Sequence, residues 1–355
     1  MTHNLHDTIR LVANATITSF QDDYENLEPV ILRWDWQPGV GLYGLVRAYE
    51  VLGDRAYLDY VRYYVDRLLA EEIVSYSING AIVFESVLKL FEHDGDPRYR
   101  DELRYFLRWL LRSAPRCQND CYEHSWTDVK VRLANQVWVD TLFVAGIVLA
   151  DSYRLFGRTD YLEEVIRQFE NHQQSLQDPA TGLFRHLYDV SSDSHMAGVF
   201  WGRGNGWMAA SAVEVLDLCG PTHPRLQPVM TAFQKQMAAI APLQAANGMF
   251  HTVLDDDSTY LEMSATAALG YAALKGVRLG VLDEQFDGIG ERALQAALAT
   301  IEPSGIVAQV SGETSGFIEY GDYNAIPTKP RLYGQTLTLL LLAEAARRFK
   351  SDPAS

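Results

Sequence analysis

The chain lacks the features of a membrane-spanning or secreted protein. None of its apolar runs is long enough to cross a bilayer, and no charged segment followed by an apolar one opens the sequence. Among 355 residues there are only 3 cysteines, Cys117, Cys121 and Cys219, which cannot all pair with one another. We therefore expect a cytoplasmic protein, in a compartment that keeps thiols reduced.

Positive charge is also scarce. The chain has 30 Lys and Arg against 46 Asp and Glu, which gives a net charge of −16 at pH 7. This excess argues against nucleic acids and anionic membranes as partners. It would also repel a small acidic ligand at long range, so arginine or helix-end amides would have to hold such a ligand locally.

Motifs for cofactors and activated nucleophiles are missing as well. The sequence has no nucleophile elbow, phosphate loop, dinucleotide-binding fingerprint or zinc-binding helix. Cys117, Cys121 and His124 stand close enough to suggest a metal site, but this spacing lacks a second half-site. We expect neither a metal nor a cofactor.

What the chain does contain is a repeated unit, in which one amphipathic helix ends, a glycine or charged turn follows, and an aromatic residue opens the next helix. Clear copies are "YEVLGDRAYLDYV" from Tyr49, "FEHDGDPRYRDEL" from Phe91 and "YRLFGRTDYLEEV" from Tyr153, with weaker ones around Gly220 and Gly280. Most of the turns lie about 60 residues apart, which divides the chain into about six helical pairs. A glycine suits the left-handed conformation that ends many helices.

Strand signals are short, in "GLFRHLYD" from Gly182 and "NGMFHTVLDDD" from Asn247, and favour extended loops or hairpins. The helical pairs could stack as an open solenoid or close into a ring of six inner and six outer helices. No linker or charge block interrupts the series. We expect one all-α domain over residues 1–355, closed into a ring.

The more apolar helix of each pair precedes the glycine turn and is the expected inner one. Polar or aromatic residues stand ahead of these helices, at Trp36, Asn79, Asp140, Asn205, Glu262 and from Arg331 to Gln335. In a closed ring all inner helices begin at the same end, so these residues would surround one mouth and the helix dipoles would favour an anion there. Each polar residue also suits a simple helix cap.

Tryptophans gather at the same places. Those in or beside the expected entrances are Trp34, Trp36, Trp126, Trp138, Trp201 and Trp207. Flat apolar rings clustered at loops around a cavity favour stacking on sugar faces over a role in the core.

Asp140 is the candidate for acid catalysis. It has no charged neighbour between Val137 and Ala150, so its carboxyl group should lose hydration, hold a proton near neutrality and act as a general acid. The alternative is a helix cap.

In "WGRGNGW", the glycines beside Arg203 would let the backbone approach a ligand, and the guanidinium would grip a carboxylate as a fork. An arginine on a flexible surface loop is the alternative. His186 is either a ligand contact or a structural residue.

Taken in order, "RWDWQPGVGLYGL", "QVWVDTLFVAG", "TGLFRHLYD", "FWGRGNGW" and "YLEMSATAALGYAAL" resemble the unsaturated rhamnogalacturonyl hydrolases of glycoside hydrolase family 105, relatives of the unsaturated glucuronyl hydrolases. The resemblance runs from about Trp34 to Ala346. It implies an (α/α)6 barrel and an oligosaccharide substrate with a 4,5-unsaturated uronic acid at its non-reducing end.

The resemblance also implies a chemistry, in which one aspartate protonates the double bond at C4, water adds at C5 and the resulting hemiketal releases the leaving sugar. By position Asp140 matches that aspartate. Residues that match or surround the substrate-contacting positions are Trp36, Asn79, Trp138, His186, Trp201, Arg203, Asn205, Trp207, Glu262 and Arg331. Asn79 stands where the family commonly has a second aspartate, which leaves open a changed linkage preference, an alignment shifted by one residue or a reduced activity. The segment with His124, Trp126 and Lys130 also departs from the family and would shape a different site for the leaving sugar.

Two other functions stay open at this stage. A sugar epimerase could use the same barrel, but it would need a pair of histidines at the mouth. A non-enzymatic helical-repeat scaffold would need an open, elongated shape. A monomer or a homodimer would suit the sequence equally well.

Overall fold

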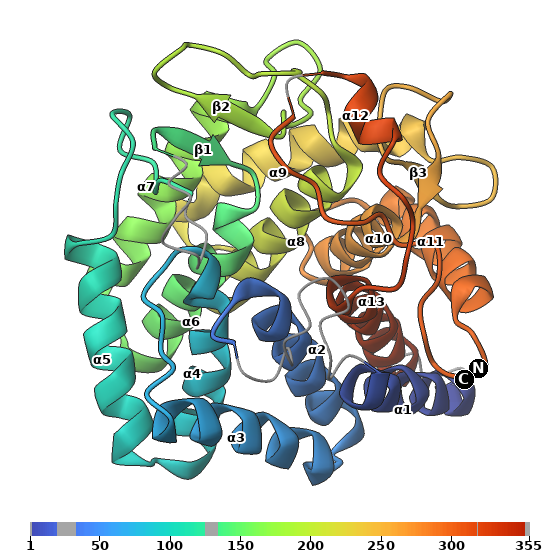
Figure 1. The fold of residues 1–355 in the computed structure, drawn as a ribbon. Coiled ribbons are helices and arrows are strands. Elements are labelled where there is room, and N and C mark those ends of the chain that lie inside the picture. Colours follow the sequence, from blue (N-terminus) through green and yellow to red (C-terminus); the bar gives the residue numbers. More distant parts are fainter. Residues whose placement is uncertain (1, 20–32, 125–133, 318, 352–355) are drawn as a thin grey trace.

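The long helices form two concentric layers in the computed structural model (Figure 1). The structure describes residues 2–19, 33–124, 134–317 and 319–351. The inner helices are α2 (Trp36–Leu52), α4 (Val83–Asp94), α6 (Ile147–Phe156), α8 (Gly202–Cys219), α10 (Met263–Arg278) and α13 (Leu332–Ser351). The outer helices are α1 (Thr2–Ser19), α3 (Arg55–Ala70), α5 (Pro97–Arg112), α7 (Thr159–Leu176), α9 (Gln227–Ile240) and α11 (Asp287–Thr300).

The inner layer closes on itself. Each inner helix packs against the next one in the chain, and the last of them, α13, packs against the first, α2. Helix α1 covers α13, so the N-terminal helix completes the last hairpin. The barrel prediction is confirmed, and the open-solenoid alternative is wrong because α13 fills the gap that a solenoid would leave.

Glycine turns join inner to outer helices as the repeat predicts. Helices α2, α4 and α6 end at Gly53, Gly95 and Gly157, whose φ values are 68°, 67° and 65°. Each glycine N–H donates to the carbonyl oxygen four residues earlier, which satisfies a helix-end acceptor.

The opposite connections are longer and carry the short strands. β1 (Gln136–Trp138) pairs antiparallel with β2 (Leu187–Asp189), and β3 (Phe250–His251) pairs with β4 (Leu261–Glu262). The two segments with strand signals therefore do form short pairings. Figure 1 shows these strands and the short helix α12 (Gly321–Asn324) at one end of the barrel. The remaining short elements are η2 (Asn79–Ile82), η3 (Leu142–Gly146), η4 (Pro224–Leu226), η5 (Ala241–Leu243) and η6 (Glu284–Phe286).

In their second halves, the inner helices carry charged side chains that form ion pairs with the neighbouring inner helix. Lys275 Nζ of α10 lies 3.0 Å from Glu214 Oε2 and 3.0 Å from Asp217 Oδ2, both on α8. Between α4 and α6, Lys89 Nζ lies 2.8 Å from Asp151 Oδ2. Burial raises the pKa of Glu214, but the attraction of Lys275 and Arg47 outweighs it and brings the pKa to about 2. Such pairs fix neighbouring inner helices relative to one another.

None of the helices in the described ranges is long and apolar enough to cross a bilayer.

We predict that Lys275→Met lowers the free energy of unfolding by about 3 to 5 kcal/mol at pH 7, because it leaves Glu214 buried without its nearest cation. Glu214 ionises more readily in the folded state, so its contribution is present above the usual carboxyl pKa and is lost as pH falls towards about 2. Denaturant unfolding at pH 7 measures the effect. Arg10→Gln, which removes an exposed pair with Asp7, is the control and should change stability little.

Candidate active site

A cavity of about 90 Å³ opens at the end of the barrel where the inner helices begin. It draws on the starts of α2, η2, η3 and α8 and on the loop ahead of α13. Its lining residues are Trp36, Val40, Asn79, His124, Trp138, Asp140, Phe143, Val144, Trp201, Arg203, Trp207, Glu313, Thr314 and Ser315. The structure therefore brings Trp36, Asn79 and Asp140 to one mouth.

Asp140 sits between strand β1 and the inner helix α6. Its carbonyl oxygen accepts from the N–H groups of Phe143, at 3.0 Å, and Val144, at 3.3 Å. The turns that follow, η3, are π-helical, a local widening that is frequent at functional sites. This geometry leaves the carboxyl group facing the cavity instead of capping the helix.

The Asp140 carboxyl group is poised between two protonation states. Burial raises its pKa from 3.8 to about 6, against the opposing effects of the Arg203 charge and a hydrogen bond from Trp207. The side chain is 24% exposed, and its Oδ2 has no hydrogen-bond partner among the described residues. A carboxyl group in this state can donate a proton near neutral pH.

His186 lies behind Asp140 and does not line the cavity. Its Nδ1 is 2.6 Å from the Tyr323 hydroxyl, and its Nε2 is 3.8 Å from Asp140 Oδ2. Burial and the nearby Arg203 charge hold the pKa of His186 well below its usual range, so the ring is neutral. His186 Nε2, Asp140 Oδ2 and the Trp201 indole nitrogen, all buried, have no hydrogen-bond partner within the described part of the chain.

Arg203 is buried and held as a fixed cation. Its guanidinium lies 4.5 Å from the ring centres of both Trp201 and Tyr333. Nη1 donates to Ser264 Oγ and Ser311 O, and Nη2 donates to Gly312 O and Thr314 Oγ1, at 2.8 to 3.3 Å. All four N–H groups of the two terminal nitrogens are therefore in use, so a fork around a ligand carboxylate would have to replace some of these bonds, and this contact stays a prediction.

The glycines around Arg203 serve packing and not approach to a ligand. A Cβ at Gly202 would lie 2.5 Å from the His251 carbonyl oxygen, and one at Gly204 would lie 2.7 Å from Trp201. The stretch is also helical from Gly202, where the sequence suggested a loop. Close contact with neighbouring segments outweighs the low helix propensity of glycine here.

The tryptophan prediction holds in part. Trp36, Trp138, Trp201 and Trp207 line the cavity. Trp34 instead packs in the core and donates from its indole nitrogen to Gly80 O at 3.1 Å.

Besides His186, three predicted contacts do not line the cavity. Asn205 is fully buried, exchanges hydrogen bonds with the Phe184 backbone and donates to Trp201 O, so it ties α8 to the neighbouring loop. Glu262 caps α10 by accepting from the N–H groups of Ser264 and Ala265. Arg331 is buried outside the lining. The capping alternative therefore holds for Glu262.

His124, which the sequence placed near the leaving sugar, lines the cavity and stacks on Trp138 with ring centres 4.6 Å apart. Glu313, Thr314 and Ser315 form one wall without having been singled out. Trp126 and Lys130, which the sequence placed near the leaving sugar, lie outside the described residues. No signal marks Glu313, because it reaches the cavity from a loop remote in sequence from Asp140.

Asn79 faces the cavity with a free amide. The residue is 7% exposed, and no hydrogen bond to its side chain forms within the described ranges. It is a neutral donor and acceptor beside Asp140. No cluster of three or more His, Cys, Asp or Glu able to hold a metal occurs among the residues that the structure describes.

A double ring of helices around a tryptophan-walled cavity with one protonatable carboxyl group defines a glycoside hydrolase built on an (α/α)6 barrel. The chain belongs to glycosyl hydrolase family 88, whose model matches residues 8–349.

Known proteins are similar to this chain over most of its length. The chain is 32% identical over 318 residues to the unsaturated rhamnogalacturonyl hydrolase YesR of Bacillus subtilis, covering 89% of this chain and 91% of that protein. A Salmonella enterica structure described as a possible family 105 member superposes with a TM-score of 0.91 at 27% identity, covering 98% and 95% of the two chains. The unsaturated glucuronyl hydrolase of Bacillus sp. GL1 shares the fold, with a TM-score of 0.73 at 15% identity and 96% of each chain covered.

We predict that Asp140→Asn stabilises the protein at pH 7 by up to about 3 kcal/mol, because about two pKa units separate the folded carboxyl group from the unfolded one. With the folded pKa raised, the stability contribution is present below pH 3.8 and is lost as pH rises through about 6. Thermal melts of both proteins should therefore differ at pH 7 and nearly coincide at acidic pH. Equal melting at pH 7 would contradict the burial assigned to this group.

Proposed function

We propose that the protein removes a 4,5-unsaturated uronic acid from the non-reducing end of lyase-generated oligosaccharides, in the cytoplasm. The observation that carries the proposal is the protonatable, partly unsatisfied carboxyl group of Asp140 in a tryptophan-walled cavity. The name of the relative YesR supports rhamnogalacturonan fragments as the source of the substrate. A monomeric or homodimeric state stays a prediction.

In the first step, the neutral Asp140 carboxyl group gives its proton to C4 of the double bond. The electron pair of the double bond forms the new C–H bond, and positive charge develops at C5 and the ring oxygen. Asp140 is then a carboxylate beside that charge, which stabilises the developing cation. A group with a pKa near 6 can both lose and regain a proton at neutral pH.

In the second step, water adds to C5 and returns a proton to Asp140. The neutral His186 ring lies beside the carboxylate that takes this proton, with its Nε2 3.8 Å from Asp140 Oδ2. Since His186 is neutral, only one of its two ring nitrogens carries a proton. The hydrogen bond between Nδ1 and the Tyr323 hydroxyl can fix which of the two nitrogens that is. The hemiketal formed at C5 then opens and releases the leaving sugar.

Binding of the uronate relies on a fixed charge and flat walls. Arg203 attracts the substrate carboxylate as a rigid cation without a free terminal N–H group. Trp36, stacked on Tyr333 with ring centres 5.3 Å apart, and Trp207 offer apolar faces to sugar rings. Asn79 is available for a hydroxyl group.

An epimerase is less compatible with this site. Burial brings the pKa of His124 to about 3, and that of His186 also lies well below its usual range. Two histidines that stay neutral at physiological pH make a poor acid and base pair for exchanging a proton on carbon.

We predict loss of the ultraviolet absorbance of the unsaturated uronide when the protein is mixed with lyase-generated rhamnogalacturonan oligosaccharides. Asp140→Asn should lower kcat by about 10²- to 10⁴-fold or more, since it removes the proton donor. The rate should fall as pH rises above about 6, where Asp140 ionises. A wild-type protein that is silent on unsaturated oligosaccharides from several polysaccharides would refute the proposal.

We further predict that Asn79→Asp moves the alkaline limb of the pH–rate profile to higher pH. A second carboxylate in the same cavity would oppose ionisation of Asp140 and raise its pKa. Asn79→Ser, which adds no charge, is the matched control and should leave the limb in place. If the alkaline limb of the pH–rate profile stays in place in Asn79→Asp, the side chains at positions 79 and 140 do not interact.

A further inference from the structure

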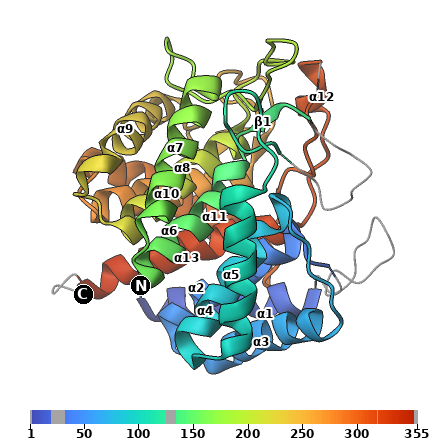
Figure 2. The ribbon, with the colours of Figure 1, turned by 90° about the vertical axis from the view of Figure 1, so that its left-hand side faces the viewer.

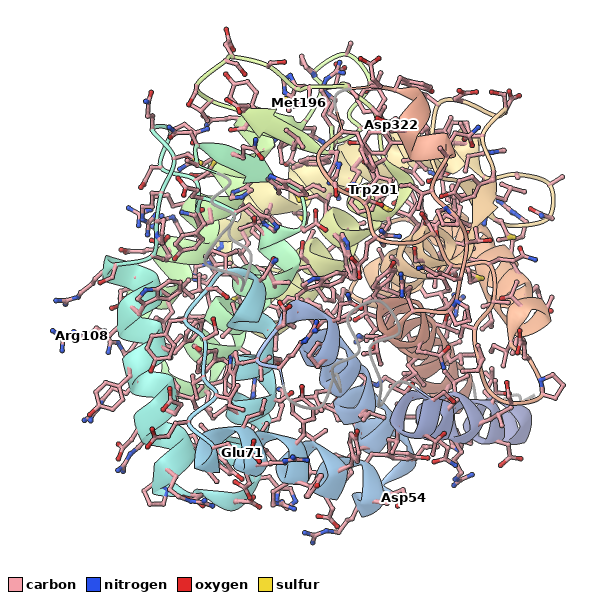
Figure 3. The ribbon with its side chains drawn as sticks, in the orientation of Figure 1. Asp54, Glu71, Arg108, Met196, Trp201 and Asp322 are labelled. Carbon is pink, nitrogen blue, oxygen red and sulfur yellow. The ribbon has the colours of Figure 1, made fainter. Side chains whose placement is uncertain are left out.

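A second concave site lies on the outer surface of the barrel, away from the catalytic cavity. The arginine groove is a depression of about 330 Å³ between α5 and the start of α7, two helices that lie side by side in Figure 2. It is lined by Arg104, Arg108, Leu111, Arg112, Arg158 and Tyr161. Figure 3 shows Arg108 projecting outward from α5, on the opposite side of the inner layer from Trp201.

Two arginines of the groove have no acidic partner. Arg108 and Arg112 are exposed and form no ion pair within the described part of the chain, and Arg104 Nη2 reaches Asp101 only at 3.9 Å. Neighbouring arginines differ, since Arg116 Nη2 lies 2.8 Å from Glu164 Oε1. Arg55 and Arg225 also form no ion pair in the described ranges, so what sets the groove apart is that its two unpaired arginines are neighbours on one helix.

The two unpaired arginines stand in line with Arg104, whose acidic contact is the long one to Asp101. Arg104, Arg108 and Arg112 are four residues apart on α5 and share one helix face, so they rise along it in steps of about 6 Å. A single small anion would meet one or two of them. A chain that carries a carboxylate on successive units would meet all three.

The floor of the groove is closed by Tyr161, which is buried beneath the guanidinium of Arg158, 4.8 Å from its ring centre. Arg158 is itself paired with Asp160. The groups of the groove that remain for an anionic ligand are therefore the arginines of α5.

We propose that the arginine groove binds the uronate-containing part of an acidic oligosaccharide, as a non-catalytic site that holds polymeric substrate or product near the enzyme. The identity of the ligand rests on the proposed function, whereas its charge and linear form rest on the groove alone. Charge complementarity supplies the argument for this occupant.

The test uses hexagalacturonate, a saturated oligosaccharide without a cleavable double bond, titrated calorimetrically into the Asp140→Asn protein. The unsaturated disaccharide is present in excess to fill the cavity. Arg108→Gln/Arg112→Gln in this background should weaken binding by at least about ten-fold, and high salt should abolish it. Arg55→Gln/Arg225→Gln, which removes two exposed arginines outside the groove, changes net charge equally and should leave affinity unchanged.

When Asp140 is kept, three proteins should turn over the short unsaturated disaccharide at the same kcat/KM. They are the wild type, the groove variant Arg108→Gln/Arg112→Gln and the control variant Arg55→Gln/Arg225→Gln. Equal hexagalacturonate affinity in the groove variant and its control would overturn the proposal. So would equal binding of neutral maltohexaose, or a preference for hexaglutamate over hexagalacturonate. Failure of catalysis on every unsaturated substrate would remove the proposed function, while the difference between the two arginine variants would still report on the groove.

Discussion

Closure of the inner ring is the constraint from which the rest of the structure follows. The ring closes because α13 packs between α2 and α10 while α1 covers it. Inner and outer helices alternate along the chain, so the inner helices all run in the same direction and begin at the same end. Segments far apart in sequence, such as Trp36, Asn79 and Asp140, then meet in one cavity. The opposite halves of the same helices bury paired charges, Lys275 with Glu214 and Lys89 with Asp151. Polar chemistry is thus placed at both ends of an otherwise apolar core.

Arg203 couples this architecture to the reaction. Its guanidinium joins α8 to the loop of Ser311 and Gly312, while Trp201 and Tyr333 stack on its two faces. A cation fixed in this way lowers the pKa of Asp140 against the larger opposing effect of burial. Burial alone would leave the carboxyl group a weaker acid. A closer, flexible cation would leave it ionised at neutral pH.

The sequence predicts most of what depends on local patterns. The turns at Gly53, Gly95 and Gly157 follow from repeated glycines after apolar helices, and Asp140 stands out because no other charge lies near it in the chain. Roles that depend on distant partners are not predictable in this way. The donors of Arg203 are satisfied by Ser311 and Gly312, more than 100 residues further along the chain. Glu262 and Asp140 both precede inner helices, and only the tertiary structure shows that the first caps a helix and the second faces the cavity.

The negative charge of the protein is compatible with the acidic sugar proposed as its substrate. At physiological ionic strength, charges separated by more than about 8 Å are largely screened, so the net charge of −16 governs approach and solubility more than contact. At contact distance the decisive groups are the few cations that acids do not neutralise. Arg203 is one, because its partners are carbonyls and hydroxyls, and Arg108 and Arg112 are others, because no carboxylate pairs with them in the described ranges. Leaving these arginines unneutralised preserves local attraction for uronates while the remaining surface stays negative.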